Sequence, residues 1–591
     1  MKKIICNPLN LEYRYQIKKE GKIPLFEGAP PDGIVFREAA DPTMIVFQDT
    51  YFLFVSMTGG FWYSEDLLSW KFKETPELPI YDYAPDVHQV GNAILFSASK
   101  SGEPCTFFRS EDPLTKPFEP VSSPFSFWDP AVFQDDDGRV YLYWGCSNSV
   151  PICGVEIDPV TLYPIGDKVP LVVENIANHG WERRGENNAL EAPKTPVEKA
   201  FQQRFGSKPF IEGAFMTKHE NLYYFQYAGP GTEYNIYGNG VYVGTAPLGP
   251  FTYQNHNPFS SKPGGFMTGA GHGSTFQDKY KNWWHITTMR ISVNDSFERR
   301  LGLFPCFFDK DGILYCDQNF GDFPFSLPDK KWDNADGAEP LWMMLSYNKK
   351  ATTSSFQKGY EPEKGVNEDA RDWWAAASRG KDQWYQLDLE KIQTVYAVQI
   401  NFADHQGQAP DIDKTNMQAE NNGDFYRKIM TRPQSTKYLL EASADGKTWF
   451  VLRDVRTTES DYAHDLILLP EPKQIRFLHV RDMELPFDIV PSISGLRVFG
   501  LGNEEKPSKV SAVETSRKNR LDILLQWEPA LGAIGYNVRY GIAPDKLYAS
   551  WQVYGENSLK ISTVSRFEGY YISVDSFNEN GVTKGTVVFV E

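Results

Sequence analysis

The feature that most constrains this 591-residue chain is a motif that recurs five times in its first half. In each copy, a small or aromatic residue precedes an acid or a histidine, and a strand-like run and a hairpin follow. The copies are Ala40-Asp41-Pro42, Pro85-Asp86-Val87, Trp128-Asp129-Pro130, Ile211-Glu212-Gly213 and Gly271-His272-Gly273. The first three lie about 45 residues apart, which is the period of a four-stranded propeller blade. The next, wider interval contains a helix-like segment at about 190–205, which we interpret as an insertion.

Short runs typical of strands fill most of the chain between Gly, Asp, Asn and Pro punctuation. Examples are Met44–Phe47, Tyr51–Ser56, Val140–Trp144, Leu222–Tyr227 and Trp283–Met289. We therefore predict an all-β fold, with a five-bladed β-propeller over residues 1–340. The first strand of each blade lines the central channel, so polar residues at the same point of five such strands converge on one axis.

Composition limits the classes of partner. Aromatic residues make up 15% of the chain, which suits strand-rich cores and also carbohydrate binding, because flat rings cover the apolar faces of sugars. The formal net charge is −17 and the pI is about 5.2. A nucleic-acid-binding chain would usually carry a basic face, and an anionic membrane would repel this charge. We expect neither partner.

The cysteines and the N-terminus bear on the compartment. The six cysteines lie at positions 6, 105, 146, 153, 306 and 316, with no CxxC spacing, which favours free thiols. Residues 1–8 contain only two apolar residues after the lysines, whereas a signal peptide needs an apolar stretch of about 7–15 residues. The sequence therefore predicts a cytoplasmic protein, or a secreted one if a leader has been removed.

Three of the repeated residues are carboxylic acids, Asp41, Asp129 and Glu212. Cleavage of a glycosidic bond needs one carboxylic acid to protonate the leaving oxygen and one carboxylate on the opposite face. A third carboxylate beside the acid can favour its protonated form by like-charge repulsion. Glu212 lies in the apolar run Phe210–Ala214, which suits a general acid.

The motifs as a set resemble glycoside hydrolase family 43. The resemblance rests on Ala40–Thr43, Tyr83–Val87, Trp128–Phe133, Ile211–Gly213 and Gly271–Ser274 in this order, and it covers about residues 25–325. It implies a five-bladed propeller and an inverting arabinofuranosidase or xylosidase that needs no cofactor for its chemistry. It also implies Asp41 as general base, Asp129 as the residue that orients the acid and modulates its pKa, and Glu212 as general acid.

The same resemblance suggests further site residues. It implies that Arg299 binds substrate, in Arg299–Pro305, and that His272 lies on the propeller axis. Members often hold a calcium ion or a water there, so His272 is a candidate position for axial calcium held through water. Trp62 and Trp128 are candidates for the walls of the sugar site, because rings stack on sugars, and packing in the core is the alternative for both, slightly favoured for Trp62. The stretch His179–Arg183 has no counterpart in the family pattern.

The second half predicts two smaller β-domains. Residues 346–503, with Trp373-Trp374, Tyr438–Trp449 and Ile493–Gly500, resemble a discoidin-type (coagulation factor type C) jelly roll, a class that often binds carbohydrate and a structural calcium. Residues 506–591 alternate cleanly at Ile523–Trp527 and Gly535–Gly541 and resemble a fibronectin type III sandwich.

Two acidic segments mimic calcium loops. Asp135–Gly138 and Asp309–Gly312 lie between strands, and neither continues into an EF-hand pattern. We interpret both as hairpin turns.

The leading hypothesis is an exo-acting, inverting α-L-arabinofuranosidase that acts on plant polysaccharide side chains or oligosaccharides. A β-xylosidase is the nearest rival, since both sugars fit similar pockets in this family. A retaining hydrolase of the invertase type fits less well, because Ala40–Thr43 stands where that class has Asn-Asp-Pro-Asn. The rival from another class is a carbohydrate-binding propeller without turnover, which would have no need of three carboxylates.

Overall fold

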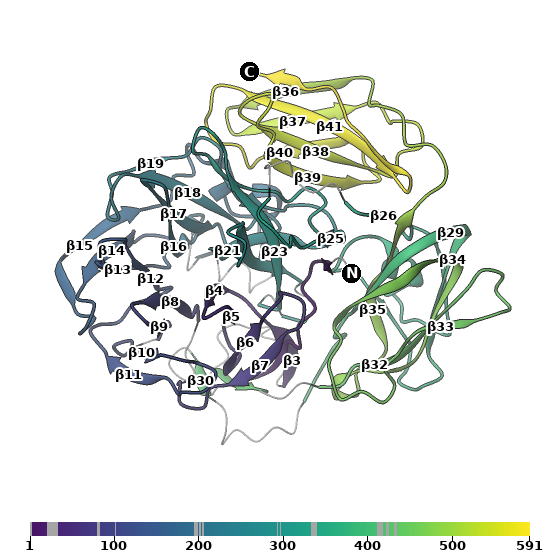
Figure 1. Ribbon diagram of the computed structural model, residues 1–591. Helices are drawn as coiled ribbons and strands as arrows, with labels where there is room; N and C mark the ends of the chain where they lie inside the picture. Colours follow the sequence, from purple (N-terminus) through teal and green to yellow (C-terminus); the bar gives the residue numbers. More distant parts are fainter. Residues whose placement is uncertain are drawn as a thin grey trace.

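The computed structural model describes residues 3–591 except 21–32, 80–82, 101, 194–198, 200–201, 204–205, 292–293, 296, 333–339, 410–417, 421–424 and 431–433. The all-β prediction is confirmed, since sheets form every layer of the molecule (Figure 1). The helix expected at about 190–205 lies largely outside the described residues. No helix among the described residues is long and apolar enough to span a membrane.

Five antiparallel sheets follow one another along the first half of the chain, and within each the strands pair in sequence order. The first contains β4 (Thr43–Phe47), β5 (Thr50–Phe54), β6 (Gly60–Ser64) and β7 (Lys71–Glu74). The second contains β8 (Asp86–Val90), β9 (Ala93–Ser97), β10 (Phe107–Ser110) and β11 (Glu119–Ser122). The third contains β12 (Ala131–Gln134), β13 (Val140–Trp144), β14 (Ile152–Ile157) and β15 (Pro164–Val172).

The fourth sheet contains β16 (Glu212–His219), β17 (Leu222–Gly229), β18 (Gly238–Gly244) and β19 (Phe251–Tyr253), with β20 (Ser260–Ser261) on β18. The fifth contains β21 (Thr268–Gln277), β22 (Trp283–Arg290), β23 (Arg299–Phe308) and β24 (Leu314–Cys316). The first strands meet their neighbours in the order β4, β8, β12, β16, β21 and back to β4. The five sheets thus close into a ring like the blades of a propeller, and we call residues 43–316 the propeller (Figure 1).

Apolar side chains fill the wedge between each pair of neighbouring sheets. Phe54 and Phe61 of the first sheet pack with Phe96 of the second, and Tyr143 of the third packs with Phe225 of the fourth. A further cluster joins Trp62 of the first sheet to the fifth and so closes the ring. Because this packing buries the faces of the sheets, the polar ends of the first strands are left around the axis.

Residues 343–501 form one large curved sheet. Its strands are β26 (Met343–Met344), β27 (Lys350–Thr353), β28 (Trp374–Ala375), β29 (Trp384–Phe402), β32 (Lys437–Ser443), β33 (Phe450–Asp454), β34 (His464–Glu484) and β35 (Ser492–Leu501). Its alternating inward residues build a core of their own around Trp374 and Tyr385. We call this part the second unit.

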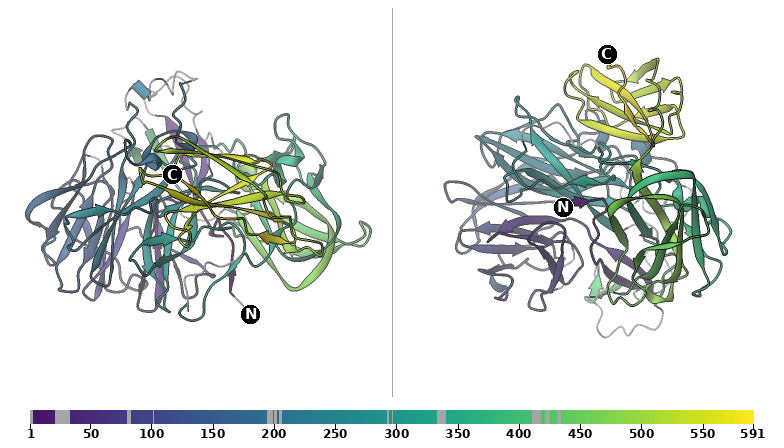
Figure 2. Two further views of the ribbon diagram at one scale, coloured as in Figure 1. Left: turned by 90° about the horizontal axis from the view of Figure 1, so that it is seen from above. Right: turned by 45° about the vertical axis from the view of Figure 1, so that its right-hand side comes forward.

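Residues 513–590 form two facing sheets, which we call the C-terminal unit. One contains β36 (Val513–Asn519), β37 (Asp522–Trp527) and β40 (Ser558–Ile561). The other contains β38 (Gly535–Gly541), β39 (Ala549–Tyr554), β41 (Tyr570–Asn578), β42 (Gly581–Thr583) and β43 (Val588–Val590). Figures 1 and 2 show that this unit and the second unit both lie against the same side of the propeller.

N-terminal strands and a segment of the second unit connect the propeller to the second unit. The N-terminal strands β2 (Arg14–Glu20) and β3 (Ile34–Glu38) pair in one sheet with β30 (Gln418–Glu420) and β31 (Phe425–Ile429), which belong to the second unit by sequence. A buried ion pair joins Arg37 to Asp404 and Asp461 on that unit. The first strand, β1 (Ile4–Ile5), pairs with β25 (Phe325–Ser326) beyond the fifth sheet.

The stretch His179–Arg183, which the family pattern does not explain, fastens the C-terminal unit to the propeller. Trp181 is fully buried against the fourth sheet and donates a hydrogen bond to the Tyr253 hydroxyl, which in turn contacts Ser565 of the C-terminal unit. Arg183 forms an ion pair with Asp522 at 2.7 Å. This segment is a docking element for the C-terminal unit.

Candidate active site

Three of the first strands in the propeller are preceded by the same tight turn. Asp41, Ala84 and Asp129 each lie two residues before their strand, and each has φ of +50°. The backbone N–H of each donates to a hydroxyl of an adjoining segment, at 2.8 Å to Thr288, Ser56 and Ser99 respectively. This left-handed conformation is uncommon for residues other than glycine, so the buried hydrogen bonds hold the turn in place.

These turns correct the register of the second repeat. Ala84, not Asp86, is the equivalent of Asp41 and Asp129, because Pro85 follows it as Pro42 and Pro130 follow the aspartates. Asp86 begins β8 inside the propeller, where it is 1% exposed and its carboxylate accepts the Val132 N–H at 2.8 Å. Burial raises the pKa of Asp86 to about 7. It is an interior group beside the channel.

The first and third turns bring Asp41 and Asp129 to one imidazole. The His272 Nδ1 lies 3.3 Å from Asp41 Oδ1 and 3.8 Å from Asp129 Oδ2. Arg299, the first residue of β23, places its Nη1 3.5 Å from the same Asp41 oxygen, and its other terminal nitrogen pairs with buried Glu38. The second Asp41 oxygen accepts a hydrogen bond from the Ser56 hydroxyl at 2.7 Å. Asp41 is thus surrounded by donors and positive charge.

Glu212, the first residue of β16, reaches the cluster from the fourth sheet. Its Oε1 accepts a hydrogen bond from the Tyr237 hydroxyl at 2.5 Å, and its Oε2 accepts one from the Cys146 thiol at 3.1 Å. The next residue, Gly213, has φ of +61° and donates its N–H to Asp129 Oδ2 at 3.4 Å. A side chain at Gly213 would collide with the His272 ring, so only glycine fits here.

Cys146 and Tyr237 are contacts of Glu212 that sequence reasoning missed. Cys146 lies two residues after the second strand of the third sheet, just as Ser56 and Ser99 lie two residues after the second strands of the first two sheets. Tyr237 immediately precedes β18. The repeated motif marks only the start of each first strand, whereas Cys146 reaches the same site from the end of a second strand.

Burial and the crowded negative charge of the cluster raise the pKa values of three of its ionisable groups. Burial, followed by the charges of Glu212 and Asp41, raises the pKa of Asp129 well above its ordinary value. Burial and the charge of Glu212 likewise raise the pKa of the Cys146 thiol and of the Tyr237 hydroxyl. Both groups therefore stay protonated at neutral pH, which is the state in which they donate to Glu212.

A partly exposed aromatic wall borders the cluster. Trp128 lies next to Asp129 in sequence, and its ring is 6.3 Å from that of Tyr83. Tyr83 in turn is 6.2 Å from Phe297, and the Arg299 guanidinium lies 5.2 Å from the centre of the Phe297 ring. These aromatic rings thus lie beside the carboxylates, and aromatic rings next to polar groups suit the apolar face of a sugar.

The structure does not bring Trp62 to this site. Its side chain is 1% exposed and packs in the wedge between the first and fifth sheets, 5.0 Å from Phe72 and 6.5 Å from Tyr13. Trp62 lies on β6, the third strand of its sheet, and that position points into the packing between blades. The expectation that it walls the sugar site is corrected to a role in the core.

The donor set near the axis does not suit calcium. Among the described residues, one group of three side chains is close enough to share an ion, namely Asp129, Cys146 and Glu212, with ligand atoms within 4.8 Å of one another. Calcium takes six to eight oxygen ligands, and a thiol is not one of its usual donors. His272 contributes nitrogen, and Arg299 already supplies positive charge beside Asp41. We therefore assign no step of the chemistry to a metal.

Comparison with known proteins relates the propeller to a family of glycosyl hydrolases. Residues 32–314 match the family model of glycosyl hydrolases family 43. Over 160 residues, or 24% of this chain and 46% of its relative, the sequence is 32% identical to "Xylosidase/arabinosidase 43A" of Humicola insolens. It is 29% identical over 158 residues, or 25% of this chain and 45% of the relative, to "Beta-xylosidase" of Xylanibacter ruminicola.

A third relative points the same way. "Arabinoxylan arabinofuranohydrolase" of Bacillus subtilis is 28% identical over 205 residues, which cover 31% of this chain and 34% of the relative. The chain thus aligns with about a third to a half of the length of these curated relatives. All three alignments involve proteins whose names describe action on xylose- or arabinose-containing sugars. Over residues 32–314, this chain is related to the glycosyl hydrolases of family 43.

Proposed function

We propose that this protein is an exo-acting, inverting glycoside hydrolase that removes α-L-arabinofuranosyl groups from plant oligosaccharides or polysaccharide side chains. The observation that carries the proposal is the meeting of Asp41, Asp129 and Glu212 at one end of the propeller, beside Arg299 and an aromatic wall. A binding protein without turnover would have no use for three carboxylates gathered at one site, because each is costly to bury.

In this proposal Asp41 is the general base. Ser56 fixes one of its oxygens, and the other faces His272 and Arg299. The Asp41 carboxylate takes a proton from the water that attacks the sugar carbon, and Arg299 and His272 hold the carboxylate in position. Inversion needs room for that water between base and acid, and acid and base on different blades leave such room.

Glu212 is the general acid, and Asp129 is the neighbouring residue that orients it and modulates its pKa. Burial and the charges of Glu212 and Asp41 raise the pKa of Asp129. As the leaving oxygen gains negative charge, the proton is delivered by Glu212, whose carboxyl is oriented by Tyr237 and Cys146.

β-Xylosidase is the alternative within this chemistry. The names of the relatives include both xylosidase and arabinofuranohydrolase activities, so similarity alone does not separate the two. An aryl arabinofuranoside and an aryl xylopyranoside, assayed side by side with the full-length protein, decide between them. Turnover of neither aryl glycoside, nor of arabinoxylan oligosaccharides, would favour the sugar-binding propeller. Proton NMR of the first-formed sugar tests inversion, and a product anomer that matches the substrate would overturn the role of Asp41.

The identities of the other two units belong to the same proposal. We propose that residues 346–503 are a discoidin-type domain and residues 506–591 a fibronectin type III domain. Support comes from the separate cores of the two units and, for the C-terminal unit, from the pairing of its strands into two sheets. In this interpretation the C-terminal unit is a docked module, and the second unit shares a sheet with the N-terminal strand β2, which precedes the propeller.

A further inference from the structure

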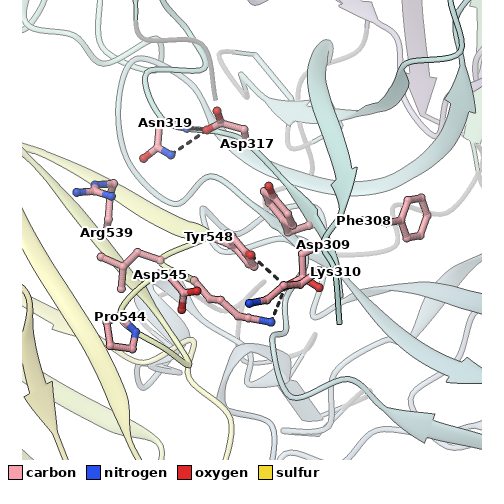
Figure 3. Close-up of a pocket in the computed structure, with 12 residues that line it drawn as sticks. Phe308, Asp309, Lys310, Asp317, Asn319, Arg539, Pro544, Asp545 and Tyr548 are labelled. Atoms are coloured by element: carbon pink, nitrogen blue, oxygen red, sulfur yellow. Dashed lines mark hydrogen bonds and ion pairs between the residues drawn. The ribbon is translucent and has the colours of Figure 1, made fainter. Parts of the chain in front are cut away.

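A cavity of about 580 Å³ lies between the fifth sheet of the propeller and the C-terminal unit (Figure 3). One wall comes from the end of β23, from β24 and from the residues after it, and the other from β38 and the loop at 544–548. Since β24 is the outermost strand of its sheet, the cavity is separate from the axis, and none of the proposed catalytic residues lines it.

The propeller side of the cavity presents a buried carboxylate. Asp317 is 8% exposed and lines the cavity. Its Oδ1 accepts two hydrogen bonds from Asn319, one from the backbone at 3.0 Å and one from the side chain at 2.8 Å. Its Oδ2 makes no hydrogen bond within the described part of the chain. Burial raises the pKa of Asp317, and the charge of Arg539 across the cavity opposes that rise.

The opposite side presents a guanidinium held in a fixed orientation. Arg539 uses Nε and Nη2 to bind Asp575, at 2.6 and 3.3 Å. Its Nη1 has no recorded partner among the described residues, and the side chain lines the cavity (Figure 3). Asn537 of the same strand donates to Asn319 at 2.9 Å and so fixes the spacing of the two walls. The acceptor on one wall and the donor on the other are therefore preorganised.

The base of the cavity is an aromatic and ionic junction. Tyr548 of the C-terminal unit stacks on Tyr315 of the propeller at 3.7 Å, with the rings within 4° of parallel. Tyr548 also donates to Asp309 at 3.0 Å, and Lys546 donates to the same carboxylate at 2.6 Å. These contacts join the two units rigidly, so the cavity keeps its shape without a ligand.

The charges around the cavity indicate the class of ligand. Three carboxylates, those of Asp309, Asp317 and Asp545, stand against three cations, those of Lys310, Arg539 and Lys546. A charged ligand would upset this equality of positive and negative charges. A neutral ligand with many hydroxyls would instead bind both the acceptor Oδ2 of Asp317 and the donor Nη1 of Arg539. Aromatic rings at the base suit the apolar face of a sugar. A volume of this size is typical of pockets that hold small molecules of a few rings.

We propose that this cavity is a second, non-catalytic carbohydrate-binding site that holds a short neutral oligosaccharide between Asp317 and Arg539. Such a site would hold a polymeric substrate to the enzyme while the propeller acts on it, and it would raise the local concentration of chain ends. The inference concerns binding only, so it does not depend on turnover at the axis.

The test uses the full chain with Glu212→Gln, which removes hydrolysis, and titrates xylotriose and arabinotriose by calorimetry. We expect one of these sugars to bind at two sites per chain. Adding Asp317→Asn, which keeps the hydrogen bonds from Asn319, should weaken one of the two sites at least tenfold. Adding Asp545→Ala, at the exposed rim, should weaken the same site by a smaller factor without disturbing a buried contact.

The matched control is Glu556→Ala, an exposed carboxylate of the same unit that does not line the cavity. It should leave both sites unchanged. The proposal is overturned if neither sugar binds outside the catalytic site, or if Asp317→Asn and Asp545→Ala leave both sites intact. A chain that binds one sugar at the cavity but hydrolyses nothing would keep this proposal and refute the proposed activity.

Discussion

The first three sheets of the propeller begin with the same turn, but only two of those turns carry a carboxylate. Asp41, Ala84 and Asp129 share φ of +50°, a following proline and an N–H bond to a hydroxyl. The strained backbone is thus a property of the repeat, because Ala84 adopts it with no chemical role. The carboxyl groups are what the first and third turns add, and function must be sought in those side chains.

The largest effect should follow from making the first turn resemble the second. Asp41→Ala should fold normally, since Ala84 shows that alanine fits this turn, and its free energy of unfolding should change by only about 1 kcal/mol. Its kcat on an aryl glycoside should fall by about a thousandfold or more, because the attacking water loses its base. Kinetics and denaturant unfolding measured together separate the two effects. Ala84→Gly is the matched control and should stay within a few-fold of wild-type activity, whereas Asp41→Ala with a tenth of the normal kcat would refute the base.

The next effect concerns the acid. Glu212→Gln should lose about a thousandfold in kcat on substrates with poor leaving groups and much less on a dinitrophenyl glycoside, which needs little protonation. Tyr237→Phe, which removes one hydrogen bond to Glu212, should show the same leaving-group dependence at about a tenth of the size or less. Equal losses on both kinds of substrate would show that Glu212 does not donate the proton.

A smaller effect distinguishes the two serines that brace the turns. The Ser56 hydroxyl donates to the Asp41 carboxylate and also accepts the N–H of Ala84. The Ser99 hydroxyl accepts the Asp129 N–H and bonds to no carboxylate among the described residues. Both alanine variants should lose about 1–3 kcal/mol of stability, because each leaves a buried N–H unpaired. Ser56→Ala should in addition lower kcat/KM by about tenfold. A larger loss of kcat/KM in Ser99→Ala than in Ser56→Ala would show that the hydrogen bond from Ser56 does not support the catalytic role of Asp41.

The smallest effect on catalysis is expected at Asp86, the residue that the repeat pattern places in the wrong register. Its pKa is raised from 3.8 to about 7 by burial, so the folded state holds a proton that the unfolded state has lost. Wild-type stability should therefore decrease as the pH rises from about 4 to 7. Asp86→Asn removes this cost and should be more stable at pH 8, by at most about 4 kcal/mol, and nearly neutral at pH 4. Thermal unfolding at several pH values measures it, and a gain that does not grow with pH would contradict the assignment.

The sequence was sufficient for some of these features because they are local. The proline after each turn and the apolar run after it identify the starts of β4 and β12, and with them Asp41 and Asp129. The second repeat was misaligned because Asp86 is the more conspicuous residue, although Pro85 marks the true register. Cys146 and Tyr237 escaped notice because their approach to Glu212 depends on how neighbouring sheets pack, which no local pattern encodes.

Long-range packing also decided the fate of the aromatic residues. Trp128 stays half-buried at the site because it precedes a first strand, whereas Trp62 on a third strand fills the wedge between blades. The alternation of a strand predicts that one face is buried but not whether that face meets another blade or a ligand. The stretch His179–Arg183 holds the C-terminal unit in place, and no local pattern in the sequence predicts that contact.

Two acidic hairpin turns carry their own counter-ions. Asp135 receives Lys218 and Tyr223 from the next sheet, and Asp309 receives Lys546 and Tyr548 from the C-terminal unit in the same manner. The chain itself supplies one lysine ammonium group to each turn. We therefore expect that a metal chelator does not affect these turns. The C-terminal unit thereby supplies a lysine and a tyrosine to the acidic turn of the fifth sheet, as the fourth sheet does for the acidic turn of the third sheet. A chain cut before residue 506 would leave the acidic turn of the fifth sheet without that lysine and dependent on ions from the solvent.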